Sequence, residues 1–203
     1  MDNKSKEVVI VGAVRTAIGT YKGSLKHIKA DQLGSIVIKE VLKRSKFNKN
    51  EIDEIIMGQV LTAGSGQNPA RQAAINAGIP ISKPAHIINQ VCGSGLRAVI
   101  SGYQSIKLGE ATNVISGGQE NMSIAPHSIF YRDEKKISED KLLDTMINDG
   151  LIDAFNNYHM GVTAENVAKK FKISRQDQDK FALNSQKKLE QAYAKNKFDE
   201  ELV

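Results

Sequence analysis

The stretch that decides how this sequence folds is NQVCGSGLRA, residues 89–98. An apolar pair, Ile87 and Ile88, leads into it, and apolar residues at helical spacing follow it as far as Ile106. Glycines on either side of Cys92 permit a tight turn. The pattern predicts a strand that stops, a turn that carries the thiol, and a helix that begins directly after it.

Cys92 is the only cysteine among 203 residues, which excludes an internal disulfide framework and any zinc site built on several thiolates. The N-terminus of a helix offers unpaired N–H groups and a partial positive charge, and both favour a thiolate over a thiol. Our leading hypothesis is therefore a nucleophilic Cys92. The alternative is a small buried hydrophobe with no chemistry, and the local pattern leaves both open.

The same stretch contains a second pattern, because GSGLRA at residues 93–98 matches the dinucleotide fingerprint G-x-G-x-x-A. That fingerprint normally follows the first strand of its unit and needs an acidic ribose ligand about 20 residues further on. Glu120 lies beyond that spacing and follows a glycine turn. Nicotinamide or flavin binding is accordingly the minor interpretation.

The composition is that of an ordinary soluble globular protein, with 40% hydrophobic and 25% charged residues. The net charge of +5 suits an anionic cofactor, an acidic membrane surface, nucleic acid or simply a solvated lysine-rich surface. Nucleic acid is the weakest of these, since the lysines are scattered and aromatic residues make up only 5%. Without a signal-peptide core or an apolar run near 18 residues, we expect a cytoplasmic protein that does not enter a membrane.

Four apolar runs predict strands, at residues 8–14, 55–61, 86–91 and 113–118. The first run is continuous from Val8 to Val14, which is typical of a central parallel strand covered on both faces. Alternating strands and helices predict an α/β fold, a mostly parallel sheet flanked by helices. Because sites in such sheets form at the carboxyl ends of strands, Cys92 lies at a suitable place.

Capping signals locate the helices. Asp31 is expected to cap the first helix, Asn68 and Pro69 to open the second, and Gly109 to close the helix that follows Cys92.

From about Glu120 the strand–helix alternation gives way to a loop-rich, helical region. Helical patterns occur at residues 142–146 and 163–171, and the charged run at 132–136 is interpreted as a solvated loop. Ser174 and Asp177 form a capping box that opens a long helix. We therefore expect two domains, an α/β domain over residues 1–121 and an α-rich loop subdomain over residues 122–203.

Five segments occur in order along the chain: VGAVRTAIG at 11–19, QNPARQAA at 67–74, NQVCGSG at 89–95, GGQENMS at 117–123 and YHMGVTAEN at 158–166. Together they resemble signatures of the thiolase family, in particular its acetyl-CoA acetyltransferase branch, and the resemblance runs from Val8 to the last residues. It implies the layered thiolase fold. A related ketoacyl synthase is a lesser alternative, against which the segment at 158–166 argues.

The resemblance implies that Cys92 takes an acyl group from acyl-CoA as a thioester, which a second, deprotonated acetyl-CoA attacks to give acetoacetyl-CoA and CoA, reversibly. It also implies that the backbone N–H of Cys92 forms half of an oxyanion hole. Leu151, His159 and Met160 match positions that line the coenzyme A pocket of the loop domain; a capping or packing role is the alternative for His159. The family uses coenzyme A thioesters as substrates, and no tightly bound cofactor or metal is implied.

Resemblance further implies a homo-oligomer, a dimer or a tetramer. Residues 123–132 match the region used for tetramer contacts, and the helix at 69–77 lies near the dimer interface. Read without the resemblance, these would be a solvent-facing loop and an amphipathic helix.

One departure from the family decides what we expect of this chain. Thiolases run to about twice this length, and their second half carries a histidine that deprotonates the nucleophile and a second cysteine in a Cys-x-Gly motif; these 203 residues contain neither. We therefore expect an N-terminal half with much of the loop domain, lacking the last strand of the first half and inactive in condensation on its own. The alternative is a non-catalytic fragment that binds coenzyme A or a partner.

Overall fold

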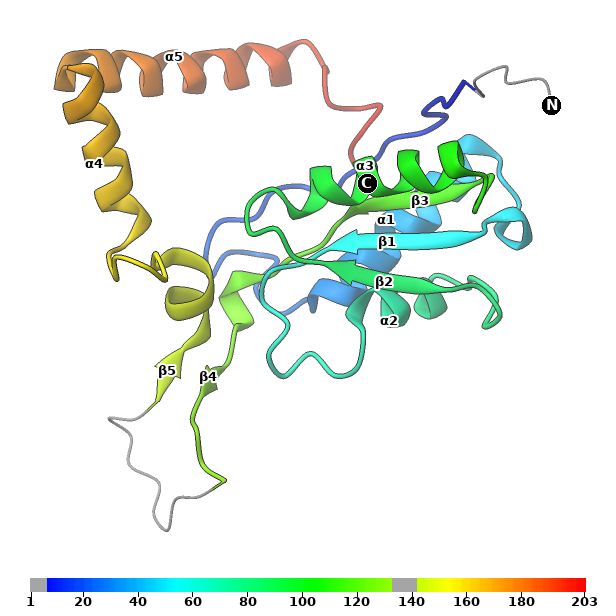
Figure 1. Ribbon diagram of the computed structural model, residues 1–203. Coiled ribbons are helices and arrows are strands. Elements are labelled where there is room, and N and C mark those ends of the chain that lie inside the picture. Colours follow the sequence, from blue (N-terminus) through cyan, green and yellow to red (C-terminus); the bar gives the residue numbers. More distant parts are fainter. Residues whose placement is uncertain (1–6, 133–141) are drawn as a thin grey trace.

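The computed structural model describes residues 7–132 and 142–203 (Figure 1). Its centre is a three-stranded parallel sheet in the order β2-β1-β3. The strands are β1 (Glu54–Gly58), β2 (Ala85–Ile88) and β3 (Val114–Gly118), and the main helices around them are α1 (Ala30–Ser45), α2 (Pro69–Asn76) and α3 (Ser94–Leu108). The predicted α/β class and parallel sheet are confirmed.

The core forms where β1 packs against α1 and α2. Ile55 and Met57, alternate residues of β1, join one buried cluster with Ile38 of α1 and with Ala70 and Ala73 of α2. The alanines let α2 approach closely, and full burial of a side chain as large as isoleucine stabilises a fold by about 1.5–3 kcal/mol. This cluster fixes β1 as the centre of the sheet.

The other face of β1 is covered by α3, and here the contact is backbone to backbone. A Cβ atom on Gly58 would lie 2.4 Å from the carbonyl carbon of Ser94 and 2.5 Å from the nitrogen of Gly95. The first turn of α3 therefore rests directly on the last residue of β1, which places the turn before α3 at the carboxyl end of the sheet.

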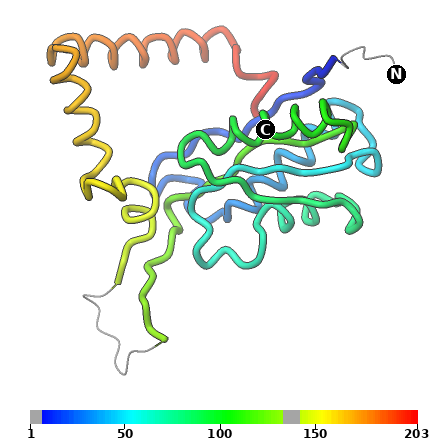
Figure 2. The backbone as a smooth tube through the Cα atoms, viewed as in Figure 1, coloured from blue at the N-terminus to red at the C-terminus, as the bar shows by residue number. Residues whose placement is uncertain are grey.

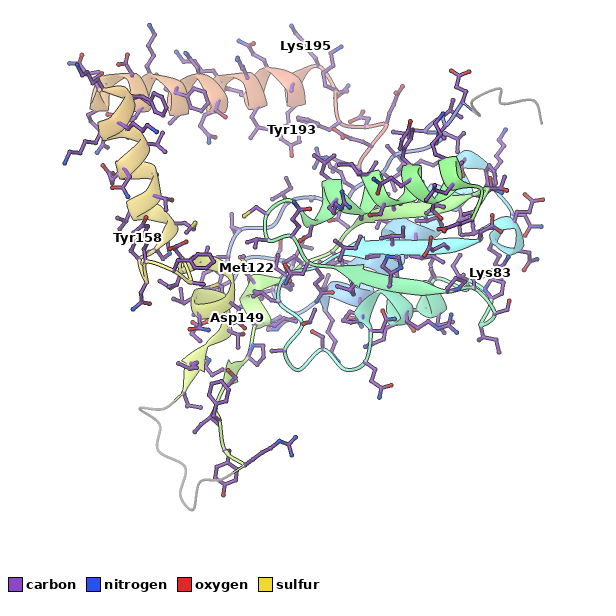
Figure 3. All side chains as sticks on the ribbon, in the orientation of Figure 1. Lys83, Met122, Asp149, Tyr158, Tyr193 and Lys195 are labelled. Atoms are coloured by element: carbon purple, nitrogen blue, oxygen red, sulfur yellow. The ribbon has the colours of Figure 1, made fainter. Side chains whose placement is uncertain are left out.

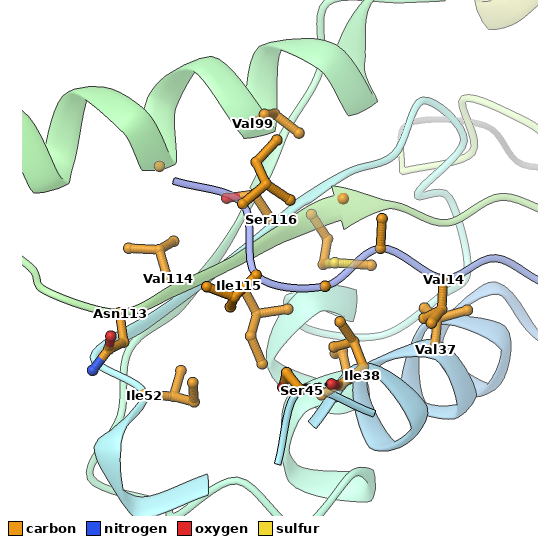
Figure 4. A pocket seen from close by; sticks show the side chains of 18 of the residues that line it. Val14, Val37, Ile38, Ser45, Ile52, Val99, Asn113, Val114, Ile115 and Ser116 are labelled. Carbon is orange, nitrogen blue, oxygen red and sulfur yellow. Dashed lines mark hydrogen bonds between the residues drawn. The ribbon is translucent and has the colours of Figure 1, made fainter. Parts of the chain in front are cut away.

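The predicted central strand at Val8–Val14 is wrong. That segment forms no strand, and the side chains of Val9, Ile10 and Val11 are 64%, 79% and 63% exposed. The central position is occupied by β1, which pairs with β2 on one edge and with β3 on the other, and the Val8–Val14 segment pairs with neither outer edge of the described sheet. The apolar run instead passes α1, α3 and β3 along a cavity of about 830 Å³ (Figure 4).

Most helix boundaries follow their capping residues. The side chain of Asn68 accepts a hydrogen bond from the N–H of Arg71 at 3.1 Å, and Pro69 is the first residue of α2. Gly109 ends α3 with φ of 80°, in the left-handed region that glycine tolerates. Asp31 is not the cap of α1 but lies in its first turn, because the helix begins one residue earlier, at Ala30.

Apart from the short helix η1 (Lys49–Glu51), which lies between α1 and β1, the remaining elements follow β3 and form an extended arm (Figure 1). They are the short helix η2 (Met122–Ile124), the antiparallel pair β4 (His127–Ser128) and β5 (Leu143–Asp144), the π-helical turn η4 (Met146–Leu151), α4 (Met160–Phe171) and α5 (Arg175–Ala194). The helical pattern at residues 142–146 was misleading, because Leu143 and Asp144 pair with β4. The predicted helix at 163–171 lies within α4, and the capping box of Ser174 and Asp177 opens α5.

Figure 2 shows the chain leaving the sheet through α4 and α5 and then returning to it. The N–H of Arg15 donates to the carbonyl of Glu201 at 2.8 Å, and the N–H of Val203 donates to the carbonyl of Arg15 at 3.1 Å. The last residues therefore lie beside the end of the Val8–Val14 segment. Most of the predicted loop at 132–136 lies outside the described residues.

Asp53 joins the segment before β1 to the beginning of β3, and its removal gives a testable effect on stability. Its Oδ2 accepts hydrogen bonds from the N–H groups of Thr112 at 2.7 Å and Asn113 at 3.1 Å, and these bonds hold the pKa of Asp53 below its ordinary value of 3.8. Because the side chain is 37% exposed, we expect Asp53→Ala to lower the free energy of unfolding by only about 1 kcal/mol near neutral pH.

The pH dependence provides the check. A lowered pKa in the folded state means that the ionised carboxylate stabilises the fold above the unfolded value of 3.8 and that this contribution is lost as the pH falls through the folded value. Urea unfolding of Asp53→Ala and the unmodified chain should therefore differ at about pH 7, and the difference should shrink as the pH falls below the unfolded value of 3.8. A difference that stays constant as the pH falls would contradict the assignment.

Candidate functional site

The candidate site is the turn between the end of β2 at Ile88 and the beginning of α3 at Ser94. Cys92 lies in this turn and is exposed. Two backbone hydrogen bonds close it, from the N–H of Gly93 to the carbonyl of Gln90 at 3.0 Å and from the N–H of Ser94 to the carbonyl of Val91 at 3.1 Å. The predicted strand, turn and helix are all present, and the exposure of Cys92 disfavours the alternative of a buried, inert residue.

Two side chains hold the turn in an unusual conformation. Asn89 Oδ1 accepts from the N–H of Val91 at 2.9 Å, while Ser94 Oγ accepts from the N–H of Gln90 at 2.8 Å and donates to the carbonyl of Val91 at 2.6 Å. Val91, directly before Cys92, has φ of 48°, a left-handed conformation that is strained for a β-branched residue. Such strain costs about 1–3 kcal/mol and is concentrated at functional sites. The hydrogen bonds of Asn89 and Ser94 therefore fix the backbone conformation that positions Cys92.

A second segment, Gln59–Leu61, lies beside the turn after β1 ends. The N–H of Gln59 donates to the carbonyl of Ile88 at 3.1 Å, and Asn89 Nδ2 donates to the carbonyl of Val60 at 3.3 Å. Asn89 thus bonds both to the segment Gln59–Leu61 and to the turn that carries Cys92.

Sequence reasoning missed the polar residues that hold Gln59–Leu61. Glu120 Oε2 accepts from the N–H groups of Val60 at 2.7 Å and Leu61 at 3.2 Å. Gln119 Nε2 donates to Gln59 Oε1 at 2.9 Å, and Gln59 Nε2 donates to the carbonyl of Leu61 at 2.9 Å. Burial raises the pKa of Glu120, an effect that these backbone N–H groups oppose. The signal in the sequence is the position of Glu120 in the signature segment 117–123, whereas the fingerprint pattern points to Glu120 only as a ribose ligand.

The three residues expected to contact coenzyme A lie close together in the arm. Leu151 ends η4, His159 caps α4, and Met160 is the first residue of α4. A backbone bridge between Ile152 and His159 brings the two ends of this loop together. His159 Nδ1 accepts from the N–H of Gly161 at 3.0 Å, so the capping role is present, and that bond leaves Nε2 unused.

The arm and the Cys92 turn meet at the segment Gln59–Leu61. A Cβ atom on Gly150 would lie 3.6 Å from Leu61 Cδ2 and 3.8 Å from Met122 Cε, so η4 packs against the buried Leu61. Figure 3 shows Met122, Asp149 and Tyr158 on the side of the sheet towards which β1 and β2 point in Figure 1. Leu151, His159 and Met160 make no hydrogen bond to Cys92 within residues 7–132 and 142–203.

Residues 8–203 match the family model described as "Thiolase, N-terminal domain". The chain belongs to the thiolase family. It is 57% identical over 198 residues to an acetyl-CoA acetyltransferase of Cupriavidus necator, an alignment that covers 97% of this chain and 50% of the relative. It is 53% identical over 197 residues to the acetyl-CoA acetyltransferase of Paracoccus denitrificans, covering 97% of this chain and 50% of the relative. It is 52% identical over 203 residues to a rat (Rattus norvegicus) protein named "Acetyl-CoA acetyltransferase, cytosolic", covering 100% of this chain and 51% of the relative.

This thiolase-family chain thus spans about half the length of the curated relatives it matches. The part of the chain that the structure describes contains no helix long and apolar enough to cross a membrane. It also contains no group of three or more His, Cys, Asp or Glu residues that could hold a metal ion.

Three of the four histidines of this thiolase-family chain have polar partners other than the thiol. His86 Nδ1 lies 3.2 Å from Glu54 Oε1, His127 Nε2 lies 3.9 Å from Asp144 Oδ2, and His159 caps α4. Within the described residues, no hydrogen bond links a histidine to Cys92. Among residues 7–132 and 142–203, the site therefore presents a nucleophile with no histidine hydrogen-bonded to it.

Proposed function

We propose that this chain supplies the acyl-accepting nucleophile, Cys92, of an acetyl-CoA C-acetyltransferase, which converts two acetyl-CoA to acetoacetyl-CoA and CoA reversibly. The observation that carries the proposal is the position of the sole cysteine, exposed in a strained, side-chain-held turn at the beginning of α3. The names of the similar proteins support the substrate class. Coenzyme A thioesters are substrates, and no tightly bound cofactor is proposed.

In the proposed first half-reaction, Cys92 is the nucleophile. The Cys92 thiolate attacks the thioester carbonyl of acetyl-CoA; the new S–C bond forms, the bond to the coenzyme sulfur breaks, and coenzyme A leaves as a thiolate that takes up a proton. The backbone N–H of Cys92 is proposed to stabilise the oxyanion of the tetrahedral intermediate, an effect worth about 3 kcal/mol in comparable sites. We assign coenzyme contacts to Leu151, His159 and Met160 and the coenzyme-binding role to residues 122–203.

Acetyl-CoA is expected to protect Cys92 from alkylation. If the thiol meets the thioester in a binding site, saturating acetyl-CoA should lower the rate of iodoacetamide alkylation by about tenfold or more, through occupancy and through the acetyl-enzyme itself. Mass spectrometry of the alkylated chain measures this rate at a single thiol. Acetyl phosphate at the same concentration is the matched control for chemical acetylation without coenzyme binding. Equal alkylation rates with and without acetyl-CoA would contradict the proposal.

Condensation is expected to fail with these 203 residues alone. Carbanion formation at the methyl carbon of a second acetyl-CoA requires a base positioned to remove the proton. Within the described residues, no histidine is hydrogen-bonded to Cys92. The purified chain with acetyl-CoA should therefore accumulate no acetoacetyl-CoA above the blank. Formation of acetoacetyl-CoA at an enzymatic rate would show that a base lies within the chain.

We propose in addition that the functional protein is a homo-oligomer, a dimer or a tetramer. The support is the family resemblance of residues 123–132 and of the helix at 69–77. A cytoplasmic location is proposed on the same footing, supported by the relative whose name includes "cytosolic".

A further inference from the structure

Glu120 is partly buried, and it accepts hydrogen bonds from the segment Gln59–Leu61 beside the Cys92 turn. A single oxygen, Oε2, accepts the N–H groups of both Val60 and Leu61, at 2.7 and 3.2 Å. Hydrogen bonds to an ionised oxygen are about twice as strong as neutral ones. Glu120 lies 60 residues from Val60 in the chain, so the contact fixes the Val60–Leu61 segment against the end of β3.

A short series of hydrogen bonds leads from that segment to the nucleophile. The carbonyl of Val60 accepts from Asn89 Nδ2 at 3.3 Å, and the other amide atom, Asn89 Oδ1, accepts from the N–H of Val91 at 2.9 Å. Val91 is the residue with φ of 48° that precedes Cys92. Each atom of the Asn89 amide therefore has a separate partner, so the position of Val60 fixes the orientation of the amide that holds Val91.

We propose that Glu120 is a positioning residue for Cys92, acting through the backbone of Val60 and the side chain of Asn89. This inference rests on the proposed function, since it assigns Glu120 to the acetyl-transfer step. Glu120 makes no described hydrogen bond to Cys92 itself, so its effect is on the conformation of the turn.

The energetic environment of Glu120 fits this role. Burial raises the pKa of Glu120, which means that the ionised form is disfavoured by its surroundings despite the backbone N–H groups that it accepts. Partly buried carboxylates with a shifted pKa are found at functional sites, and here the shift accompanies the two hydrogen bonds to the segment beside the Cys92 turn.

The test compares Glu120→Gln with Glu110→Gln in the 203-residue chain. Glutamine keeps the shape of Glu120 and removes the charge that strengthens the two bonds, while Glu110 is an exposed carboxylate just after α3 and controls for lost charge. With acetyl-CoA as the probe, the maximal rate of Cys92 acetylation should fall roughly tenfold in Glu120→Gln, because small displacements of a reacting group have large effects. The half-saturating acetyl-CoA concentration should not change. Wild-type behaviour of Glu120→Gln would overturn the proposal.

A double-mutant cycle separates positioning from general damage to the fold. If Glu120 acts through Asn89, then in an Asn89→Ala background the further change Glu120→Gln should lower the rate by less than about twofold. A persistent tenfold effect of Glu120→Gln in that background would contradict the pathway and overturn the proposal.

A measurement that needs no acetyl transfer, the NMR spectrum of the backbone amides, distinguishes failure of this inference from failure of the proposed function. The amide resonances of Val91 and Cys92 should shift in Glu120→Gln and stay in place in Glu110→Gln. If the unmodified chain takes no acetyl group, the proposed function fails, and these resonances alone then decide whether Glu120 positions the turn. Unmoved resonances would show that it does not.

Discussion

Replacing Cys92 with serine is expected to lower the rate of acetyl transfer from acetyl-CoA to the chain by at least about a thousandfold. A thiol is a few per cent ionised near neutral pH and strongly nucleophilic, whereas a serine hydroxyl needs a base to remove its proton. No histidine is hydrogen-bonded to Cys92 in residues 7–132 and 142–203, so the substituted hydroxyl would have no such help.

Cys92→Ser should change the chemistry without changing the fold, because the side chain is exposed and serine is nearly isosteric with cysteine. The unfolding midpoint should stay where it is in the unmodified chain. The rate is measured as radiolabelled acetyl incorporated into the protein. Incorporation by Cys92→Ser at more than about a tenth of the original rate would mean that another residue accepts the acetyl group, and the assignment would be wrong.

The second large effect is on the fold that holds the turn. In Gly58→Ala, the added methyl group would lie 2.4 Å from the carbonyl carbon of Ser94, 2.5 Å from the nitrogen of Gly95 and 2.7 Å from the carbonyl oxygen of Ser94. These are backbone atoms of the first turn of α3, which cannot rotate away as a side chain would. We expect the free energy of unfolding to fall by about 3 kcal/mol or more.

Gly117→Ala provides the matched control on the neighbouring strand, because its methyl group would meet only the side chain of Met57, with Sδ at 3.8 Å and Cε at 4.0 Å, which are ordinary contact distances. That variant should lose less than about 1 kcal/mol. Urea unfolding of both variants measures the difference. Equal stability of the two would show that β1 and α3 do not touch as described.

Local signals in the sequence predicted those parts of the fold that depend on near neighbours. Asn68 and Pro69 open α2, and Gly109 closes α3, through contacts within four residues of each cap. The turn around Cys92 was predicted for the same reason, since its glycines and the apolar residues on both sides are contiguous. Such features require no knowledge of which strands become neighbours.

The misassigned parts depend on distant partners. The apolar run Val8–Val14 has the pattern of a central strand, but the central position between β2 and β3 is occupied by β1. The hydrogen bonds of Glu120 to Val60 and Leu61 cross about 60 positions and leave no periodic pattern. Leu143 and Asp144 form a strand only because residues 127–128 lie opposite them.

The central claim is that Cys92 alone accepts the acetyl group, and mapping that group on the chain tests it most directly. After incubation of the 203-residue protein with acetyl-CoA, peptide mass spectrometry should find an added mass of about 42 Da on Cys92, removable by hydroxylamine at neutral pH as a thioester is. An unmodified Cys92 peptide, or the added mass on lysines alone, would contradict the account.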